Sequence, residues 1–238
     1  MPAYATRLQR RRDLTEGAAA FVLARPEGFT FQAGQSINLT LVDPPEKDAK
    51  GNTRTFSLVS APHEPFLEVA TRLRTSAFKR VLAALPPGSP LQFRGPGGKF
   101  TLAEDERPAV LLAGGIGITP FVSMLRDAAQ RMPQRPLTLI YANRRLEDAA
   151  YLAELQALRR QLPNLRLVPT VTGTDVPRSG NAEAGPIDRT MIARHVADLS
   201  AATFFVAGPP AMVSALKTML VEAGVDAAQV RIDEFYGY

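Results

Sequence analysis

The hydrophobic pattern of the chain changes near residue 104, and this change constrains the fold more than any other feature. Before it, apolar residues alternate with polar ones, as in residues 35–42 (QSINLTLV) and 66–74 (FLEVATRLR). A period of two residues is typical of strands. Between Ser76 and Leu85 the apolar spacing is helical, with Ser76 as a plausible N-cap. The first hundred residues therefore predict an antiparallel β-barrel or sandwich that carries one helix.

After residue 104, short apolar runs alternate with helical patterns. The runs are AVLLA, LTLIYA, LRLVPTV, TFFVA and QVRID. Strands that alternate with helices favour a parallel sheet with crossover connections, so five parallel strands are expected here. We therefore predict two domains, an all-β domain over residues 1–104 and an α/β domain over residues 105–238.

The composition excludes several classes of site. None of the 238 residues is cysteine, so this chain has no disulfide, thiolate zinc site, cysteine nucleophile or iron–sulfur cluster on cysteine ligands. Its two histidines, His63 and His195, are too few for a histidine-rich metal site, and no metal is expected. The N-terminus lacks the apolar core of a signal peptide, and glycines and a proline break the longest uncharged run. We expect a cytoplasmic protein without a membrane association.

The formal net charge is +5, and arginines cluster near the N-terminus at Arg7, Arg10, Arg11 and Arg12. Such a cluster would suit an anionic cofactor, an acidic partner or nucleic acid. A solvated edge strand is the simpler interpretation, so nucleic-acid binding is not expected. A non-catalytic basic interaction module remains an alternative.

The stretch AGGIGITP (residues 113–120) follows the first apolar run of the α/β half. Gly114, Gly115 and Gly117 predict a turn, while Thr119 is expected to cap the next helix with Pro120 in its first position. Glycines let a phosphate approach the backbone, and a helix N-terminus attracts anions, so the turn suits a nucleotide diphosphate. A standard Rossmann dehydrogenase is disfavoured because Pro120 stands where G-x-G-x-x-G requires its third glycine.

Three further stretches join this turn: FQAGQ (31–35), RTFS (54–57) and GPPAM (208–212). Together, in order and spacing, the four stretches resemble the ferredoxin–NADP reductase-like family of flavoenzymes over essentially the whole chain. The resemblance implies an FAD-binding antiparallel barrel followed by an NAD(P)-binding α/β domain. FAD and either NADH or NADPH are the implied cofactors.

The resemblance assigns flavin contacts in the barrel. RTFS matches the family's R-x-Y-S pattern, so Arg54 would neutralise the flavin pyrophosphate, Phe56 would lie against the isoalloxazine, and Ser57 would bond near its N5. Phe56 replaces the usual tyrosine, which preserves stacking and removes the phenolic hydrogen bond. Ser76 would contact the diphosphate. The other expected flavin contacts are Thr55, Thr71 and Arg72.

In the second half, the resemblance assigns the nicotinamide dinucleotide to Gly114, Gly115, Gly117, Thr119 and Pro120. Gly208, Pro209 and Met212 match the family's C-G-x-x-x-M segment, in which Ala207 takes the place of the cysteine. That cysteine assists hydride transfer in many relatives. Its loss indicates that nicotinamide positioning differs here, while the flavin itself still accepts the hydride.

The C-terminal residues DEFYGY correspond to the family's acid and aromatic cover of the flavin. The resemblance implies that Ser57 and Glu234 are catalytic. It also implies that Phe235, Tyr236 or Tyr238 stacks on the flavin, without deciding among the rings.

The stretch VTGTD after the third α/β strand bears on the choice of nucleotide. Phosphate-preferring relatives have a serine followed by arginine there, whereas this chain has Thr172, Thr174 and Asp175. Asp175 would repel a 2′-phosphate, so NADH is slightly favoured. Three arginines could supply the missing charge from elsewhere: Arg144, Arg145 and Arg178.

The expected function is a flavin-dependent NAD(P)H oxidoreductase that passes a hydride to FAD and electrons onward to a separate acceptor. The positive charge favours an acidic, ferredoxin-like acceptor. A flavin or quinone reductase with a diffusible acceptor is the main alternative.

Overall fold

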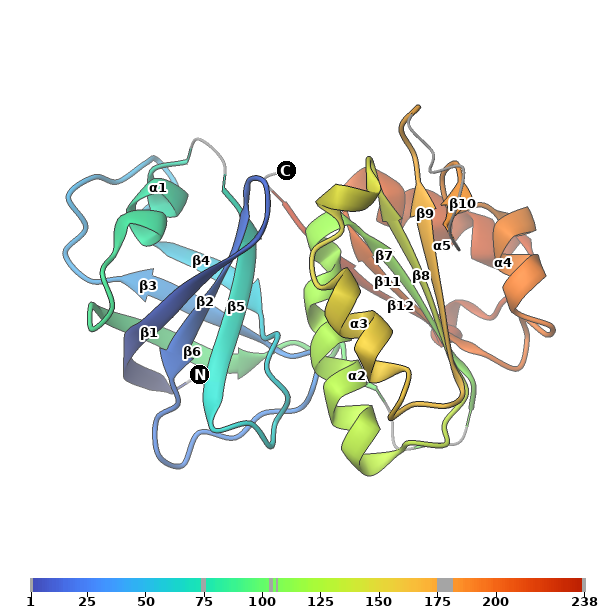
Figure 1. Ribbon diagram of the computed structural model, residues 1–238, viewed down its shortest axis with the longest axis horizontal. Helices are drawn as coiled ribbons and strands as arrows, with labels where there is room; N and C mark the ends of the chain where they lie inside the picture. The colour runs from blue at the N-terminus through green and yellow to red at the C-terminus, as the bar shows by residue number, and fades with distance from the viewer. Residues whose placement is uncertain (1, 74–75, 103–104, 106, 175–181, 237–238) are drawn as a thin grey trace.

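The computed structural model describes residues 2–73, 76–102, 105, 107–174 and 182–236. Two halves lie side by side, each built on a six-stranded sheet (Figure 1). The predicted combination of an antiparallel barrel and a parallel α/β half is confirmed. The predicted division between residues 104 and 105 stays a prediction, because part of this connection lies outside the described residues.

The first sheet is antiparallel, with the strand order β4-β3-β6-β1-β2-β5. Its strands are β1 (Ala3–Thr15), β2 (Ala18–Ala24), β3 (Ser36–Leu41), β4 (Thr53–Ser57), β5 (Phe66–Arg72) and β6 (Pro90–Gly97). Leu58, after β4, bridges Val69 of β5, and the Val59 amide donates to the Glu68 carbonyl at 2.8 Å. These contacts bring the two edge strands together, so the sheet closes into a barrel.

The barrel core follows from the predicted alternation. Ile37, Leu39 and Leu41 are at most 2% exposed and share the inner face of β3. Helix α1 (Ala77–Ala84) packs Phe78 against this core, and Ser76 caps it by accepting from the Lys79 amide at 3.4 Å. The predicted helix and its cap are confirmed.

The second sheet has the order β10-β9-β8-β7-β11-β12 and is parallel. Five strands match the five predicted runs: β7 (Ala109–Gly114), β8 (Leu137–Asn143), β9 (Leu165–Val171), β11 (Thr203–Gly208) and β12 (Val230–Glu234). The sixth, β10 (Glu183–Ala184), pairs with the end of β9. The sequence gives no signal for β10, because two residues are too few to show a period.

Helices cover both faces of the parallel sheet (Figure 1). Helices α2 (Thr119–Arg131) and α3 (Leu152–Leu158) lie on the face toward the barrel, and α4 (Arg189–His195) and α5 (Pro210–Glu222) lie on the other. Short 3₁₀ turns occupy Gly115–Ile118, Leu146–Asp148 and Ala227–Gln229. Within the described part of the chain, no helix is both long and apolar enough to span a bilayer.

Helix α2 forms the junction of the two halves. Its Phe121 and Val122 are fully buried in one apolar cluster with Ala20 and Ala70 of the barrel. Strand β5 is consequently covered on both faces, by the barrel core on one side and by α2 on the other. This explains why Glu68, on the face where alternation predicts solvent, is only 3% exposed.

Candidate active site

The glycine-rich turn lies at the carboxyl end of β7. Gly115–Ile118 form a 3₁₀ turn that continues directly into α2. The prediction that Thr119 caps this helix is wrong. Thr119 already has helical angles (φ −54°, ψ −50°), its hydroxyl donates to the Ile116 carbonyl at 3.1 Å, and Ile118 holds the capping position. Pro120, predicted at the first position of the helix, is the second residue of α2, because the helix begins one residue earlier than predicted.

The turn after β7 packs against the turn after β11 with almost no space between them. A Cβ on Gly114 would lie 2.5 Å from the Met212 sulfur, and one on Gly117 would lie 2.5 Å from the Ala207 carbonyl oxygen. Gly208, with φ +152°, would place a Cβ 2.9 Å from the Met212 methyl. Gly117 must be glycine because its neighbours are backbone atoms, and the φ of Gly208 favours glycine, whereas at Gly114 the Met212 side chain would have to move. The predicted nucleotide residues of the two segments therefore pack directly against each other.

The second turn continues into α5, with Pro209 in the capping position. The Phe235 amide donates to the Gly208 carbonyl at 2.9 Å, so the half-buried Phe235 is anchored against the same turn. Of the other two candidates for the flavin cover, Tyr236 is 77% exposed and Tyr238 lies outside the described residues.

On the barrel side, Arg54 lies beside the first turn of α1. Its guanidinium donates to Asp48 at 2.5 Å and lies 5.2 Å above the Phe78 ring. The hydrogen bond from Arg54 holds the pKa of Asp48 below its ordinary value. An anion at the α1 N-terminus, capped by Ser76, would be close to this guanidinium, so the donor set fits a diphosphate.

The other predicted flavin residues surround this position on β4 and β5. Phe56 is 8% exposed, with its ring 5.8 Å from that of Phe78. Thr55 is exposed and donates to Asn38 at 2.7 Å. Thr71 is buried near the end of β5, where its hydroxyl donates to the Arg72 carbonyl at 3.2 Å.

One hydrogen bond joins the two halves at the carboxyl end of the parallel sheet. The Ser57 hydroxyl donates to Asp233 Oδ2 at 3.3 Å. Burial raises the pKa of Asp233 above its ordinary value, and the bond from Ser57 opposes this rise only in part. A half-buried carboxyl therefore faces Ser57, the serine that was predicted to lie near flavin N5.

Glu234, the predicted catalytic acid, instead contacts the Tyr236 hydroxyl. Neighbouring residues on a strand point to opposite faces, so only one of the two acids can face the barrel. Asp233 pairs in register with Ala207, on the face that carries α2, and this pairing selects Asp233. Arg231 lies two residues before Asp233, on the same face of β12, and donates to the Thr101 carbonyl of the barrel at 2.8 Å. The alternation along β12 is therefore the sequence signal that favours Asp233 over Glu234.

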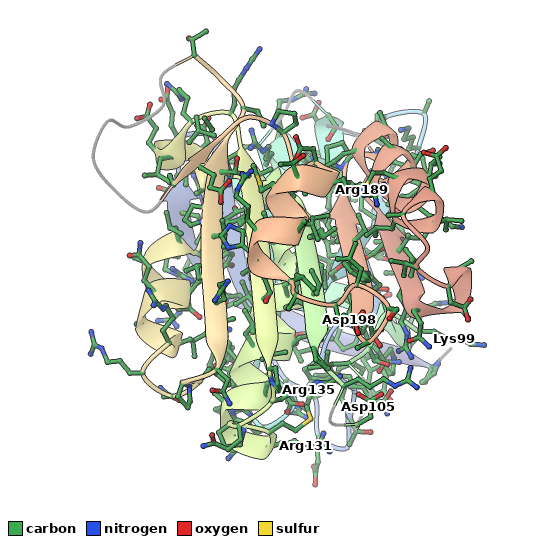
Figure 2. The ribbon with its side chains drawn as sticks, turned by 90° about the vertical axis from the view of Figure 1, so that its right-hand side faces the viewer. Lys99, Asp105, Arg131, Arg135, Arg189 and Asp198 are labelled. Atoms are coloured by element: carbon green, nitrogen blue, oxygen red, sulfur yellow. The ribbon has the colours of Figure 1, made fainter. Side chains whose placement is uncertain are left out.

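A groove of about 590 Å³ opens beside Asp233. It is lined by Gly98, Lys99, Phe100, Arg231, Ile232 and Asp233. Figure 2 shows Lys99 at the edge of the molecule, away from the α4 side of the sheet. The two cations, Lys99 and Arg231, make this approach to the Ser57–Asp233 pair electropositive on its outer side.

The tips of β8 and β9 hold the residues predicted to affect nucleotide choice. The Thr172 amide donates to the Asn143 carbonyl at 2.8 Å, and the Gly173 amide donates to the Arg144 carbonyl at 3.0 Å. Arg145 is paired with Glu147 at 2.8 Å and with Asp148 at 2.9 Å. Thr174 is exposed, whereas Asp175 and Arg178 lie outside the described residues.

The opposite end of the sheet carries a separate ion pair. Figure 2 shows Arg135 beside Asp105 near the starts of the strands, where the two side chains are 2.7 Å apart. Arg135 also donates to the Arg107 carbonyl at 3.0 Å, so it ties the connection between the halves to the base of β8. Over the described residues, no group of three or more acidic or histidine side chains is placed to hold a metal ion.

A barrel with Arg54 beside the start of its helix, a parallel sheet with glycine turns and a half-buried acid between them are the features expected of a flavin- and nicotinamide-dependent oxidoreductase. An oxidoreductase NAD-binding domain model matches residues 111–218. Ferredoxin–NADP reductase B of Sorangium cellulosum is 31% identical over 230 residues, which cover 91% of this chain and 90% of that protein. The chain therefore belongs to the ferredoxin–NADP reductase family of FAD-dependent NAD(P)H reductases.

Two further proteins are similar to this chain over most of its length. Terephthalate 1,2-dioxygenase reductase component 2 of Comamonas is 29% identical over 210 residues, which cover 86% of this chain. This chain spans 59% of the length of that relative. A ferredoxin NADP+ reductase from Neisseria gonorrhoeae, solved with bound FAD and NADP, superposes with a TM-score of 0.83 at 22% identity over 98% of both chains.

Proposed function

We propose that this reductase delivers its electrons to a separate acceptor, and that an acidic ferredoxin-like protein is the first candidate. The observation that carries the proposal is the Ser57–Asp233 contact, which brings the barrel residues proposed to bind FAD next to the sheet proposed to bind the nucleotide. The names of the relatives, a ferredoxin–NADP reductase and a dioxygenase reductase component, support a protein acceptor.

The barrel residues would bind and orient FAD. Arg54 and the Ser76-capped start of α1 would hold the diphosphate, while Phe56 would lie against the ring, with Thr55, Thr71 and Arg72 around it. When bound, FAD supplies a ring that accepts a hydride and releases electrons singly or as a pair. The protein supplies position and electrostatics.

The nucleotide would lie on the surface formed by the turns after β7 and β11. Gly114 and Gly117 let the two turns pack closely together. The phosphates would approach at the partly exposed Gly115 and the start of α2, where amide groups and the helix dipole favour negative charge. Gly208 and Met212 form the opposite wall, and the fully buried Ala207 leaves space where relatives have a cysteine.

Ser57 and Asp233 would act at the reacting end of the site. The raised pKa of Asp233 means that this carboxyl holds a proton at a higher pH than an ordinary aspartate does. We assign Asp233, in place of Glu234, as the acid that holds a proton near Ser57, and we assign Phe235 as the anchored aromatic cover.

A screen of acceptors under one reductant tests the proposal. The purified protein should be yellow, and its flavin absorbance should bleach anaerobically with NADH or NADPH. Turnover is then compared with ferredoxins, cytochrome c, free flavin and quinones. Fast turnover with a ferredoxin supports the proposal, and turnover with free flavin or quinone alone would contradict it.

A second candidate, a reductase of small diffusible acceptors, is favoured by the groove beside Asp233. Its volume of about 590 Å³ lies within the range of small-ligand sites. In this case a quinone should compete with the ferredoxin for electrons, and filling the groove with Ile232→Trp, at an exposed lining residue, should block the quinone alone.

NADH is proposed as the preferred reductant. Arg145 is already paired with two carboxylates, which weakens its availability for a 2′-phosphate. Steady-state rates with both reductants test this preference. A kcat/KM for NADPH that exceeds that for NADH tenfold, about 1.4 kcal/mol, would reverse it.

A further inference from the structure

A buried charge cluster joins the two halves at a distance from the reacting residues. The carboxylate of Glu68, on β5, is 3% exposed and accepts from three donors. They are Arg12 at 2.9 Å, Arg126 at 3.2 Å and the Tyr151 hydroxyl at 2.9 Å. Arg126 and Tyr151 belong to the α/β half, so Glu68 joins the barrel to that half through two of its three contacts.

Arg126 is the second centre of the cluster. It donates to Glu154 at 2.7 Å, to Glu64 at 3.2 Å and to the Val59 carbonyl at 3.2 Å. Burial opposes its charge, but the bond to Glu154 and the charges of Glu154, Glu68 and Glu64 outweigh burial and raise the pKa of Arg126. A buried cation needs these partners, so the two halves are held in one arrangement.

Tyr151 adopts a backbone conformation that is uncommon for a residue with a side chain. Its φ is +63° and its ψ is 5°, in the left-handed region that favours glycine. Such conformations persist where surrounding contacts enforce them. Here the hydroxyl reaches Glu68, and the Arg12 guanidinium lies 5.4 Å above the ring. Tyr151 is thus both strained and a donor of a hydrogen bond across the junction.

Glu68 and Arg126, the two centres of the cluster, each lie on a segment that leads to the reacting site. The Glu68 carbonyl accepts from the Val59 amide at 2.8 Å, two residues beyond Ser57. Arg126 lies on α2, the helix that begins at Thr119 after the nucleotide turn. A displacement at Glu68 would therefore move Ser57 and the nucleotide turn relative to each other.

We propose that Glu68 is a positioning residue that, through Arg126 and Tyr151, sets the approach of the nicotinamide to the flavin ring. The inference rests on the proposed placement of both cofactors at the Ser57–Asp233 contact. Hydride transfer depends steeply on the separation and alignment of the reacting atoms, so a shift of about 1 Å can cost on the order of a hundredfold in rate.

Rapid-reaction kinetics of the FAD-loaded enzyme test this role. Tyr151→Phe removes only the hydroxyl, and Glu68→Gln removes the charge while preserving the shape. At saturating NADH under anaerobic conditions, each variant should reduce its flavin at least tenfold more slowly than the wild type. The isotope effect with NADH deuterated at C4 should stay equal or rise, while FAD occupancy and the Kd for NADH change less than twofold.

Arg11→Gln is the matched control. Arg11 neighbours Arg12 on β1 but pairs with Asp13 at 2.7 Å, within the barrel. Its flavin should be reduced within twofold of the wild-type rate. The double variant Glu68→Gln/Tyr151→Phe should be no slower than the slower single variant, because both changes break one contact.

Two results would overturn the positioning role. One is a limiting rate within twofold of wild type in both variants, and the other is a loss of rate that lost FAD fully explains. A wild-type protein that binds FAD but is reduced by neither NADH nor NADPH would instead overturn the proposed function, and this inference with it.

Discussion

Arg54 holds the loop that contains Asp48, and it is also proposed to bind the flavin diphosphate. In the structure it is held by Asp48 and by the Gly51 carbonyl at 3.0 Å, and in the proposed complex it also faces the flavin diphosphate. Arg54→Ala should weaken FAD binding about ten- to a hundredfold, because a charge-assisted hydrogen bond of roughly 1.5–3 kcal/mol is lost. Equilibrium dialysis followed by flavin absorbance measures this loss.

Asp48→Asn is the control for that prediction. It breaks the same ion pair while leaving the Arg54 guanidinium in place, so FAD affinity should stay within about threefold of wild type. An Arg54→Ala protein that keeps full FAD occupancy after dialysis would show that Arg54 only supports the loop.

Asp233 gives a prediction that depends on pH. Burial raises its pKa in the folded protein, so ionised Asp233 reduces stability above that pKa, and the reduction disappears as pH falls toward the unfolded value. Asp233→Asn should therefore increase the free energy of unfolding at pH 8, with a gain that vanishes near pH 4. Urea denaturation of the FAD-loaded protein at both pH values measures the difference.

The same variant should reduce flavin more slowly with NADH, because the proton-holding group is lost. Glu234→Gln is the matched control and should change neither property, since Glu234 contacts Tyr236 rather than Ser57. Equal slowing in both variants would contradict the assignment of Asp233.

At the level of single residues, local patterns predicted only part of the site. Arg54, Phe56 and Ser57 were predicted because their motif is contiguous, and their contacts with FAD stay predictions. The cap at Ser76 was predicted because capping has a local signal, and the structure confirms it. Asp233 was missed in favour of its neighbour because register against β11 decides which acid faces Ser57. Glu68 was missed because only the packing of α2 against β5 reveals its burial.

The glycine turn after β7 has a close backbone contact whose loss can be tested by a single substitution. Gly117→Ala would place a methyl group 2.5 Å from the Ala207 carbonyl oxygen, and backbone atoms on both sides must then move. The expected cost is about 1–3 kcal/mol, with a rise in KM for the nicotinamide nucleotide as the two turns separate. Thermal unfolding and steady-state kinetics measure the two effects.

Gly88→Ala separates this clash from a general glycine effect. Gly88 has φ +90° and nothing within 4 Å of an added Cβ, so only backbone strain, about 1–2 kcal/mol, is expected. Its KM for the nucleotide should not change. A raised KM in this variant too would indicate global loosening rather than displacement of the turn.

The elements were predicted well where periodicity was long. The strands β3 and β5, with helix α1, follow directly from repeats of two or 3.6 residues, while β7 follows from a continuous apolar run. Errors occur where the pattern is short or continuous: β10 has two residues, and the 3₁₀ turn at Gly115–Ile118 merges into α2 without a cap. Neither feature has a local signal that differs from a loop.

For the whole molecule, two domains of different architecture were predictable because the change of period is visible in the sequence. Their relative arrangement was not, because it depends on side chains far apart in the chain, such as Ser57 with Asp233 and Glu68 with Tyr151. The two halves also differ in charge. Lysine and arginine outnumber acidic residues by five in residues 1–104, and the numbers are equal in residues 105–238.

This asymmetry predicts how salt affects the choice of acceptor. An acidic protein should be steered toward the barrel half and the groove at Lys99, and screening weakens steering because the Debye length falls from about 10 Å at 0.1 M salt to about 3 Å at 1 M. Raising NaCl from 0.05 to 0.5 M should lower kcat/KM for an acidic ferredoxin at least about tenfold, and for a neutral quinone less than about twofold. At low salt, Lys99→Glu should reduce ferredoxin turnover several-fold, whereas Arg159→Glu, an exposed substitution in the neutral half, should not. Equal salt dependence for both acceptors would mean that the positive barrel does not select the partner.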